Sequence, residues 1–557
     1  MENNYFFKGK PEPAVFDREI FVNQSGYLPH GRKRAVIKVP CEKFNIENEY
    51  GTVVYSGETV HFGKDECSGD DIYFADFSDL CSEGRYTVVT ERGERSLEFS
   101  IGDNIYAPVF DKLVKAYYYL RCGSELCAEH AGQFARPSCH NSSAIEYGSD
   151  GTTKYDVSGG WHDAGDYGRY VTAGACAAAH MLYAYKLFPT AFETQRLGIP
   201  NDGGLPDVLK EVKYELLWLL KMQRTDGAVW HKATTMTHAQ FVMPHEDTAQ
   251  MYLFAPSSIA AADFTAICAL GAEVYRGKDD AFADRLAAAA EKAWLWLEEN
   301  PEFIGFQNPE GCNTGSYGER NDIDNRFWAA AQLYSLTGEQ KYLDRLNSMM
   351  IGFSMCDLGY GTVGGLGSLA LLLGGRKIPE RLYDRIKRDF NSKATELKGL
   401  YSSCGYGAAI GGWQFNWGSN MNILKAAMTF IITDRINGKH QYTDCITAQL
   451  DYLLGVNATG YSFVTGCGEF CVKNPHLRPA YADNIDECIP GYVSGGPNGN
   501  PSDPDALILV PKGTPPMKCF VDDVSCYSLN EITIYWNSPA VFLLAYFMNE
   551  NKKIDED

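Results

Sequence analysis

The sequence predicts a mainly α protein, in which a small N-terminal β-sandwich precedes six pairs of helices that close into a barrel. Short β-rich runs fill residues 17–103, and twelve segments with helical spacing of apolar residues follow over 104–550. The chain of 557 residues exceeds one ordinary core, and its 45% hydrophobic content supplies a large interior. No β-run alternates with the helical segments and no solenoid-like repeat is visible, which disfavours a parallel sheet and a solenoid.

The N-terminal segment, 17–103, is predicted to be a separate β-sandwich domain. Its β-rich runs are divided by turn signals such as Ser25-Gly26 and Glu83-Gly84, and their regular spacing shows no helical pattern. None of its residues forms an arrangement typical of a catalytic site. The predicted strands cover 19–23, 34–39, 52–55 and 85–89.

The remainder, 104–550, is predicted to be one domain of paired helices joined by long connections. Several helical segments begin at a cap or a proline, such as Ser257 and Pro379, and others end near Gly277 or Gly438. Paired helices bury their apolar faces when they close on one another, and the count suits a six-pair barrel with its loops at one end. The predicted helices span 108–122, 169–187, 207–222, 258–276, 280–299, 325–336, 339–351, 364–373, 379–391, 419–435, 442–454 and 537–549.

Charge and composition exclude some partners. The net charge of −21 would repel nucleic acid, so a neutral ligand is expected, and the 13% aromatic residues offer flat apolar faces for one. No apolar run reaches the length of a membrane span, and the first residues lack a basic-then-apolar leader. Seventeen scattered cysteines favour reduced thiols and predict a cytoplasmic location.

The most informative stretch is Gly159–Tyr167, which places Asp163 and Asp166 three residues apart with a histidine and aromatics alongside. Its glycines permit a tight backbone in which two carboxylates point at one small volume, as proton transfer with water requires. The alternative is a helix-entry loop in which one aspartate caps the helix that begins near Tyr170.

A candidate metal site lies around this stretch. Cys122, Cys139, His140 and His162 supply two thiolates and two imidazoles, a tetrahedral zinc set. Their spacing is not that of a zinc finger, so buried free cysteines and ordinary histidines remain the alternative. A closed site with four ligands would be structural, and it would fasten the loop that carries the two aspartates.

The run Asn474–Pro479 is a second candidate for the site. Its prolines hold the chain extended, so His476 and Arg478 project to the same side, where they can donate to neutral hydroxyl groups or orient a carboxylate. An ordinary surface loop is the alternative for this piece alone.

Glu531 is the third candidate, because it lies among Tyr527, Ile532, Ile534 and Trp536. Apolar and aromatic surroundings raise the pKa of a carboxyl group and keep it protonated near neutral pH, which suits a general acid. An ionised aspartate and a protonated glutamate together make the two-carboxylate pattern of glycoside hydrolysis.

With these residues the chain resembles members of glycoside hydrolase family 9, formerly cellulase family E. The resemblance is strongest to the clostridial subgroup with an N-terminal immunoglobulin-like domain. The resemblance covers nearly the whole chain and implies an (α/α)6 barrel, which agrees with the helix count. The matching stretches, in order, are Val22–Tyr27, Gly159–Tyr167, Tyr214–Glu215 with Met222–Gln223, Val229–Lys232, Arg326–Ala330, Trp417–Asn420 and Asn530–Glu531.

The resemblance implies roles for the three carboxyl groups. Asp166 matches the catalytic base that activates water, Asp163 the partner that helps to hold this water, and Glu531 the general acid that protonates the leaving oxygen. The implied reaction inverts the anomeric carbon, with base and acid separated by about 6.5–9.5 Å to admit the water.

The resemblance also implies ligand-binding residues. His476 and Arg478 match the family's sugar-binding histidine and arginine, and we further expect His231, Tyr527 and Trp536 to contact the substrate. Cys122, Cys139, His140 and His162 match a structural zinc site of the subgroup. Calcium is common in the family near the loop 200–207, but this loop carries few acids here, and the metal-like run 319–324 is similarly sparse.

The sequence therefore predicts an inverting hydrolase of β-1,4-glucosidic bonds in cellulose-type glucans. The predicted cytoplasmic location favours soluble cello-oligosaccharides or fragments of mixed-linkage β-glucan as substrates. Two alternatives remain open at this point: an exo-acting β-glucosidase or glucosaminidase of the same family, and a glucan-binding protein without catalysis. The presence of all three carboxyl groups argues against the latter.

Overall fold

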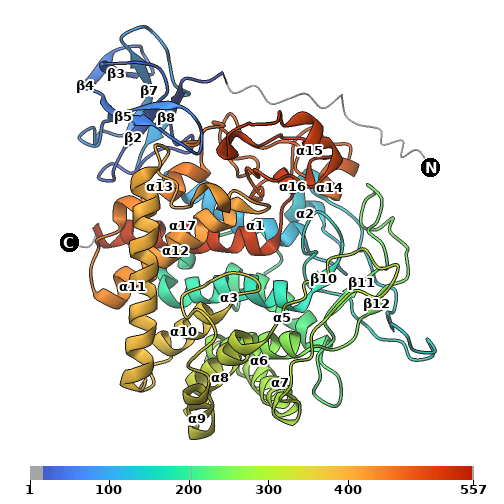
Figure 1. Ribbon diagram of the computed structural model, residues 1–557. Coiled ribbons are helices and arrows are strands. Elements are labelled where there is room, and N and C mark those ends of the chain that lie inside the picture. Colours follow the sequence, from blue (N-terminus) through green and yellow to red (C-terminus); the bar gives the residue numbers. More distant parts are fainter. Residues whose placement is uncertain (1–16, 202, 555–557) are drawn as a thin grey trace.

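The computed structural model describes residues 17–201 and 203–554, and it confirms a mainly α barrel preceded by a β-sandwich (Figure 1). The sandwich consists of two antiparallel four-stranded sheets with strand orders β1-β2-β6-β5 and β4-β3-β7-β8. The strands are β1 (Ile20–Phe21), β2 (Arg34–Ile37), β3 (Lys43–Asn48), β4 (Val53–Glu58), β5 (Val60–Lys64), β6 (Asp71–Asp76), β7 (Gly84–Thr90) and β8 (Phe99–Ile101).

The core of the sandwich forms between its two sheets from alternating residues of the strands. Ile37, Phe44, Ile46 and Val88 are almost fully buried there, because successive side chains on a strand point to opposite faces. The four predicted strands are present. Strands β3, β5, β6 and β8 were not predicted, since polar residues interrupt most of them, as in the acid-flanked run of β6.

Six helices form the inner ring of the barrel and are buried on nearly all sides. Pairs α3–α6, α6–α8, α8–α10, α3–α17 and α12–α17 pack against one another. A helix surrounded by other helices needs no polar face, which explains why α3 and α6 are buried along almost their whole lengths. The inner helices are α3 (Val171–Leu187), α6 (Ser258–Tyr275), α8 (Ile323–Thr337), α10 (Gly364–Leu373), α12 (Ser419–Asn437) and α17 (Ile534–Ile554).

Six further helices cover this ring. Most are amphipathic with one buried stripe, whereas the last of them is buried over 445–453. They are α1 (Ala107–Tyr119), α5 (Asp207–Lys221), α7 (Asp280–Glu299), α9 (Gln340–Ser348), α11 (Glu380–Ser403) and α13 (Thr443–Leu453). All twelve predicted helices are therefore present. Helix α11 continues twelve residues beyond its predicted end at 391, because Ala394 and Leu397 extend its buried stripe.

Short elements in the long connections complete the fold. The small sheet β10-β11-β12-β9 lies at one end of the barrel beside the loop that carries the candidate aspartates. The short helices are α2 (Ala128–Ala131), α4 (Pro189–Glu193), α14 (Arg478–Ala482), α15 (Pro504–Leu509), α16 (Tyr527–Asn530), η1 (Gly132–Phe134), η2 (Gly412–Gln414) and η3 (Pro516–Lys518). The strands are β9 (Ile145–Glu146), β10 (Arg169–Tyr170), β11 (Lys232–Thr234) and β12 (Tyr252–Leu253).

Polar contacts join the sandwich to the barrel. Asn23 Nδ2 donates to Asp451 Oδ1 at 2.9 Å, and the backbone N–H of Gly405 donates to Asp65 Oδ2 at 2.7 Å. Asp70 accepts a hydrogen bond from Tyr406 at 2.8 Å. The two parts are thus packed together in one body.

One inner helix has the length and apolar composition of a membrane span. Helix α6 meets both criteria, but 94% of it is buried inside the protein, against α3, α7 and α8. No other described helix of that length is apolar enough. Its apolar character is therefore explained by its place in the inner ring.

Candidate active site

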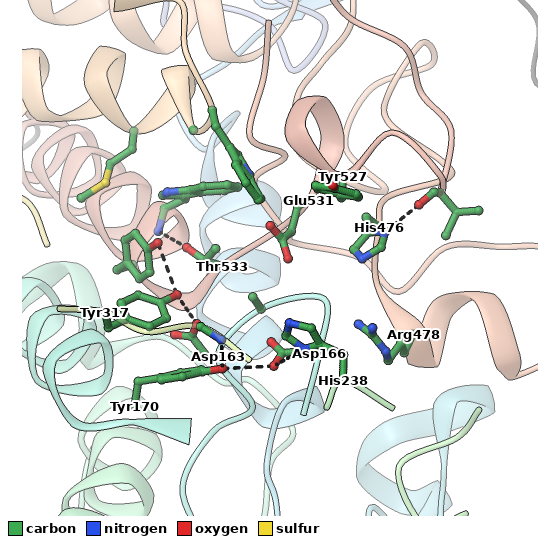
Figure 2. Close-up of a pocket in the computed structure, with 18 of the residues that line it drawn as sticks. Asp163, Asp166, Tyr170, His238, Tyr317, His476, Arg478, Tyr527, Glu531 and Thr533 are labelled. Atoms are coloured by element: carbon green, nitrogen blue, oxygen red, sulfur yellow. Dashed lines mark hydrogen bonds and ion pairs between the residues drawn. The ribbon is translucent and has the colours of Figure 1, made fainter. Parts of the chain in front are cut away.

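A cavity of about 990 Å³ opens at the end of the barrel where the long loops gather, and it contains most of the predicted site residues (Figure 2). Aromatic, carboxyl and amide side chains line it, a composition suited to a neutral sugar. The predicted residues that line it are Asp163, Asp166, His476, Arg478, Tyr527, Glu531 and Trp536.

The loop that carries the two aspartates is fixed by backbone contacts. Gly160 has φ +73°, and a Cβ at this position would lie 2.7 Å from the ring of Trp218, so only glycine fits there. The backbone N–H of Ile534 donates to the carbonyl of Asp163 at 2.8 Å, and Ala164 forms an isolated β-bridge with Thr533. The loop is therefore tied directly to the segment that follows Glu531.

Asp166 is buried, and its side-chain hydrogen bonds and ion pair with the described residues all involve one oxygen. Its Oδ2 accepts from the N–H of Gly168 at 3.1 Å and from Tyr170 Oη at 3.3 Å, and it lies 3.2 Å from His238 Nδ1. Burial raises the pKa of Asp166, but the contact with His238 and the charge of Arg478 outweigh burial, so the pKa lies below its ordinary value. Asp166 is therefore ionised, and its Oδ1 remains available to water.

Asp163 complements this arrangement. Its Oδ2 accepts a hydrogen bond from Tyr317 Oη, and its Oδ1 is buried without a hydrogen-bond partner among the described residues. Burial, and then the neighbouring charge of Asp166, raise the pKa of Asp163 well above its ordinary value. A buried oxygen without a partner beside Asp166 offers a second acceptor for one water molecule.

Glu531 faces the two aspartates from the opposite wall of the cavity (Figure 2). Burial, and then the charge of Asp166, raise its pKa to about 8, although Arg478 and hydrogen bonds from Gly165 and Trp417 oppose this. Glu531 is thus protonated at neutral pH while Asp166 is ionised, as the apolar surroundings in the sequence predicted.

His476 and Arg478 also line the cavity, His476 on the side of Glu531 and Arg478 on the side of Asp166 (Figure 2). His476 donates from Nδ1 to the carbonyl of Val524 at 2.6 Å, which leaves Nε2 as an acceptor. Arg478 donates from Nε to the carbonyl of Ala239 and from Nη1 to that of Gly165, both at 2.8 Å. Arg478 therefore fixes two loops of the cavity as well as contributing its charge.

His231 does not contact the cavity, so the prediction that it binds substrate is wrong. Its ring is fully buried, stacks on Phe306, and forms hydrogen bonds with Ser257 Oγ at 2.8 Å and the carbonyl of Ser316 at 2.9 Å. Burial lowers its pKa to about 3, so the ring is neutral. His231 holds the loop beside Tyr317 in place.

Three residues that contact the carboxyl groups were not predicted from the sequence. Tyr170 and His238 contact Asp166, and Tyr317 contacts Asp163. Tyr317 also has φ +48°, an uncommon conformation for a side chain of this size, which is characteristic of functional sites. Of the three, only Tyr170 could have been suspected from the sequence, because it follows the aspartate segment by only a few residues.

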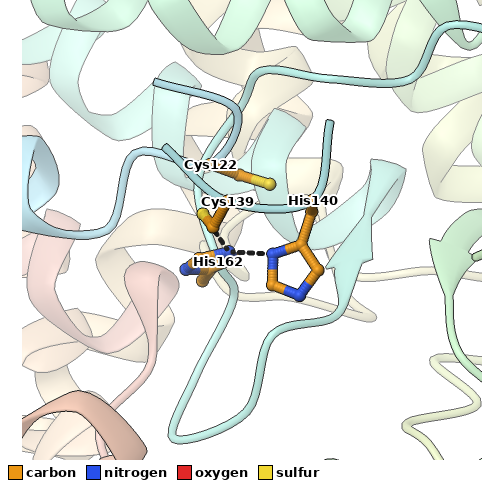
Figure 3. Close-up of side chains that lie close together, drawn as sticks. All are labelled: Cys122, Cys139, His140 and His162. Atoms are coloured by element: carbon orange, nitrogen blue, oxygen red, sulfur yellow. Dashed lines mark hydrogen bonds between the residues drawn. The ribbon is translucent and has the colours of Figure 1, made fainter. Parts of the chain in front are cut away.

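The four predicted zinc ligands lie close together, and one of them, His162, directly precedes Asp163 in the aspartate loop (Figure 3). All four are buried, and one ligand atom from each lies within 4.8 Å of the others. His162 Nε2 is 3.4 Å from His140 Nδ1 and 3.9 Å from Cys139 Sγ. Buried thiols and imidazoles at this separation fit the donor set of a closed zinc site.

Neighbouring groups orient these ligands. His140 Nε2 lies 3.3 Å from Asp247 Oδ2, a carboxylate–histidine pair of the kind that supports zinc ligands. Arg136 Nη1 donates to Cys139 Sγ at 3.3 Å. Hydrogen bonding by Cys122, and then by the two histidines, holds the pKa of Cys139 below its ordinary value, which favours a thiolate there.

The two calcium candidates differ in the structure. In the loop 200–207 the carboxylate of Asp207 already accepts from the N–H of Leu197 and from Asn201, which leaves little for a cation. Near 319–324, burial raises the pKa of Glu319 to about 8. The adjacent Asn325 Oδ1 is buried without a partner among the described residues, so this second cluster has oxygen donors available.

Comparison with known proteins identifies the family. The sequence model "Glycosyl hydrolase family 9" matches residues 106–544, and "Cellulase N-terminal ig-like domain" matches residues 16–95. The chain belongs to glycosyl hydrolase family 9. It is a glycoside hydrolase of the cellulase type, with the immunoglobulin-like domain that the resemblance implied.

Members of family 9 resemble the chain over nearly its whole length. It is 44% identical to a cellodextrinase of Butyrivibrio fibrisolvens over 547 residues, which cover 95% of this chain and 99% of that protein. It is 33% identical to endoglucanase D of Acetivibrio thermocellus, covering 98% of this chain and 86% of that protein. A thermostable endoglucanase from Alicyclobacillus acidocaldarius superposes with a TM-score of 0.90 at 32% identity, covering 95% and 99% of the two chains.

Proposed function

We propose that this chain hydrolyses β-1,4-glucosidic bonds in cello-oligosaccharides and related β-glucans, with inversion of the anomeric carbon. The observation that carries the proposal is the opposition of an ionised Asp166 and a protonated Glu531 across one cavity. Inverting glycosidases require this pair of protonation states, with room for a water between the two groups.

In this mechanism Asp166 is the general base. A water held between Asp166 Oδ1 and the unpartnered Asp163 Oδ1 attacks the anomeric carbon and gives its proton to Asp166. Glu531 donates its proton to the glycosidic oxygen, and the bond to the leaving sugar breaks. Tyr170 and Tyr317 hold the distal oxygens of the two aspartates, so that the near oxygens face the water.

Soluble cello-oligosaccharides are the proposed preferred substrates. The likeness to the Butyrivibrio cellodextrinase, at 44% identity over almost all of both chains, supports this choice. Tyr527 and Trp536 on the wall of the cavity, together with Trp417, provide aromatic faces on which neutral sugar rings stack. His476 Nε2 and the remaining N–H groups of Arg478 are available to sugar hydroxyls.

A product profile on cellopentaose and barley β-glucan tests the proposal. The wild-type protein is expected to release oligosaccharide products from both substrates. Asp166→Asn is expected to release none of them in the same time, while it still binds cellopentaose. Release of glucose alone from cellopentaose would instead support the exo-acting alternative. Hydrolysis of neither substrate by the folded wild-type protein would contradict the proposal.

We propose in addition that Cys122, Cys139, His140 and His162 hold a structural zinc ion. Zinc there supplies folding free energy to the aspartate loop and no open coordination position for catalysis. The support is the buried donor set with its partners Arg136 and Asp247. Zinc analysis of the purified protein tests this: Cys139→Ser is expected to lose the tightly held ion, and an unchanged zinc content would contradict it.

Calcium is proposed for the cluster near 319–324 rather than for the loop 200–207. Asp324, Glu319 and the orphan oxygen of Asn325 supply hard oxygen ligands next to a cavity of about 400 Å³. A rise in melting temperature on adding calcium, absent in Glu319→Gln, is expected. An equal rise in both proteins would contradict this site.

A further inference from the structure

Three residues around α2 form a second group of metal-type ligands that neither the cavity nor the buried cysteine–histidine cluster uses. Cys127 precedes α2, and Glu129 and His130 lie on its single turn (Figure 1). One ligand atom from each lies within 4.8 Å of the others. Cys127 and His130 are half-buried and Glu129 is exposed, so the group is accessible from solvent.

The hydrogen bond of His130 fixes its tautomer. His130 Nδ1 lies 3.0 Å from the carbonyl oxygen of Gly198. A carbonyl oxygen only accepts hydrogen bonds, so the neutral ring carries its proton on Nδ1, and Nε2 has a free lone pair. Metal-binding histidines in proteins are oriented in the same way, by a hydrogen bond from the other ring nitrogen to a carbonyl or carboxylate.

A buried hydroxyl group without a partner lies beside the same cluster. Tyr118 is 1% exposed, and its Oη has no hydrogen-bond partner among the described residues. Its ring is in edge contact with the ring of His130, with centroids 6.3 Å apart. A buried hydroxyl normally has a hydrogen-bond partner, and a water held by an ion in this group would supply one.

The other two donors are uncommitted. Neither the Cys127 thiol nor the Glu129 carboxylate forms a hydrogen bond or an ion pair with any residue in the described part of the chain. Ligand atoms of a tetrahedral zinc site are roughly 3.5 Å apart, so closing the group requires shifts of about 1 Å. A rotamer change of the exposed Glu129 side chain is sufficient for much of this.

The chemistry of the donor set selects the ion. A thiolate and an imidazole prefer zinc over magnesium or calcium, and the carboxylate is an accepted third zinc ligand. Three protein ligands leave the fourth position to water, and the exposure of Glu129 lets the ion exchange with solvent. This distinguishes the group from the closed, four-ligand cluster around Cys122.

We propose that Cys127, Glu129 and His130 form a second, exchangeable zinc site on the surface of the barrel domain. The three side chains would supply three ligands to the ion, and water would take the fourth position. Through His130 and Gly198, the ion fastens α2 to the loop that precedes α5. None of the three ligands lines the catalytic cavity, so loss of the ion is expected to leave hydrolysis unchanged.

The test is zinc stoichiometry with a rapid chelator, on the full chain loaded with zinc and freed of excess. A colorimetric chelator is expected to remove about one zinc ion per chain from the native wild type at once. Cys127→Ser and His130→Gln are each expected to lose this fast fraction. Cys81→Ser is the matched control, because Cys81 is an exposed thiol outside any group of metal-type ligands among the described residues.

The outcome separates this site from the closed one. The slow fraction, released only when the protein unfolds, is expected to persist in Cys127→Ser and to disappear in Cys139→Ser. If the closed cluster binds no zinc, the slow fraction is absent, but the fast fraction and its loss in Cys127→Ser remain. A wild type without a fast fraction, or a Cys127→Ser protein that keeps it, overturns the proposal.

Discussion

The contact between His238 and Asp166 makes the acid side of the pH–activity profile a test of the site. His238 Nδ1 lies 3.2 Å from Asp166 Oδ2, and against the effect of burial the hydrogen bonding and charge of His238 hold the pKa of Asp166 below its ordinary value. His238→Asn removes this charge and keeps a polar side chain of similar reach. Fewer groups then oppose the effect of burial, so the pKa of Asp166 rises.

The size of the effect follows from the geometry. An opposite charge within about 4–6 Å lowers the pKa of a carboxyl group by about 1–3 units. The side chain of His238 is 35% exposed, so solvent screens its charge and the lower end of the range applies. We therefore expect the acid limb of kcat/KM to move upward by about one pH unit, since Asp166 must be ionised to act as a base.

The assay is kcat/KM for cellotetraose across the pH range in which the folded protein is stable. The alkaline limb, which reflects ionisation of Glu531 with its pKa of about 8, is expected to stay in place. His61→Asn is the control, because His61 forms a comparable pair with Asp71 on the sandwich domain, with 2.8 Å between Nε2 and Oδ1. An acid limb in His238→Asn that superimposes on that of the wild type would refute the reasoning.

Three other substitutions have defined outcomes. Asp166→Asn removes the base, so kcat is expected to fall by about 10²–10⁴, while calorimetry still detects cellotetraose binding; hydrolysis at the wild-type rate would remove Asp166 from this role. Glu531→Gln cannot donate a proton, so kcat is expected to fall similarly and the alkaline limb near pH 8 to vanish from the profile; a surviving limb would assign it to another group. Gly160→Ala forces a Cβ to 2.7 Å from Trp218 and is expected to cost about 1–3 kcal/mol of stability more than Gly277→Ala, where the space is open at a similar φ; equal denaturation midpoints would contradict this packing.

The helices were predictable because the pattern of apolar residues within each segment indicates a helix. An inner helix such as α6 is apolar throughout, and an outer helix such as α7 shows one apolar stripe, so both types could be located. Strands of the sandwich with polar interruptions, such as β6, leave a weaker trace and were missed. The closure of the helices into a ring depends on contacts between distant segments, which no local pattern shows. It was therefore predicted from the helix count together with the family resemblance.

The candidate site was predictable only in part, for the same reason. Asp163 and Asp166 are recognisable because they lie three positions apart in a glycine-rich segment. Tyr317 and His238 reach these carboxylates from distant loops, and the sequence around each of them contains no pattern that indicates the contact. His231 shows the opposite error: it lies in a family-like motif, but its side chain points into the packed interior, and residue spacing does not determine that direction.

The stereochemistry of the first product tests the opposition of Asp166 and Glu531 most directly. Proton NMR spectra recorded in the first minutes of cellotetraose hydrolysis report the anomer formed before mutarotation mixes the two forms. Direct attack of water by way of Asp166 predicts the α-anomer as the initial product. Initial release of the β-anomer would mean that a carboxylate attacks the sugar itself, and the water-mediated arrangement described above would be contradicted.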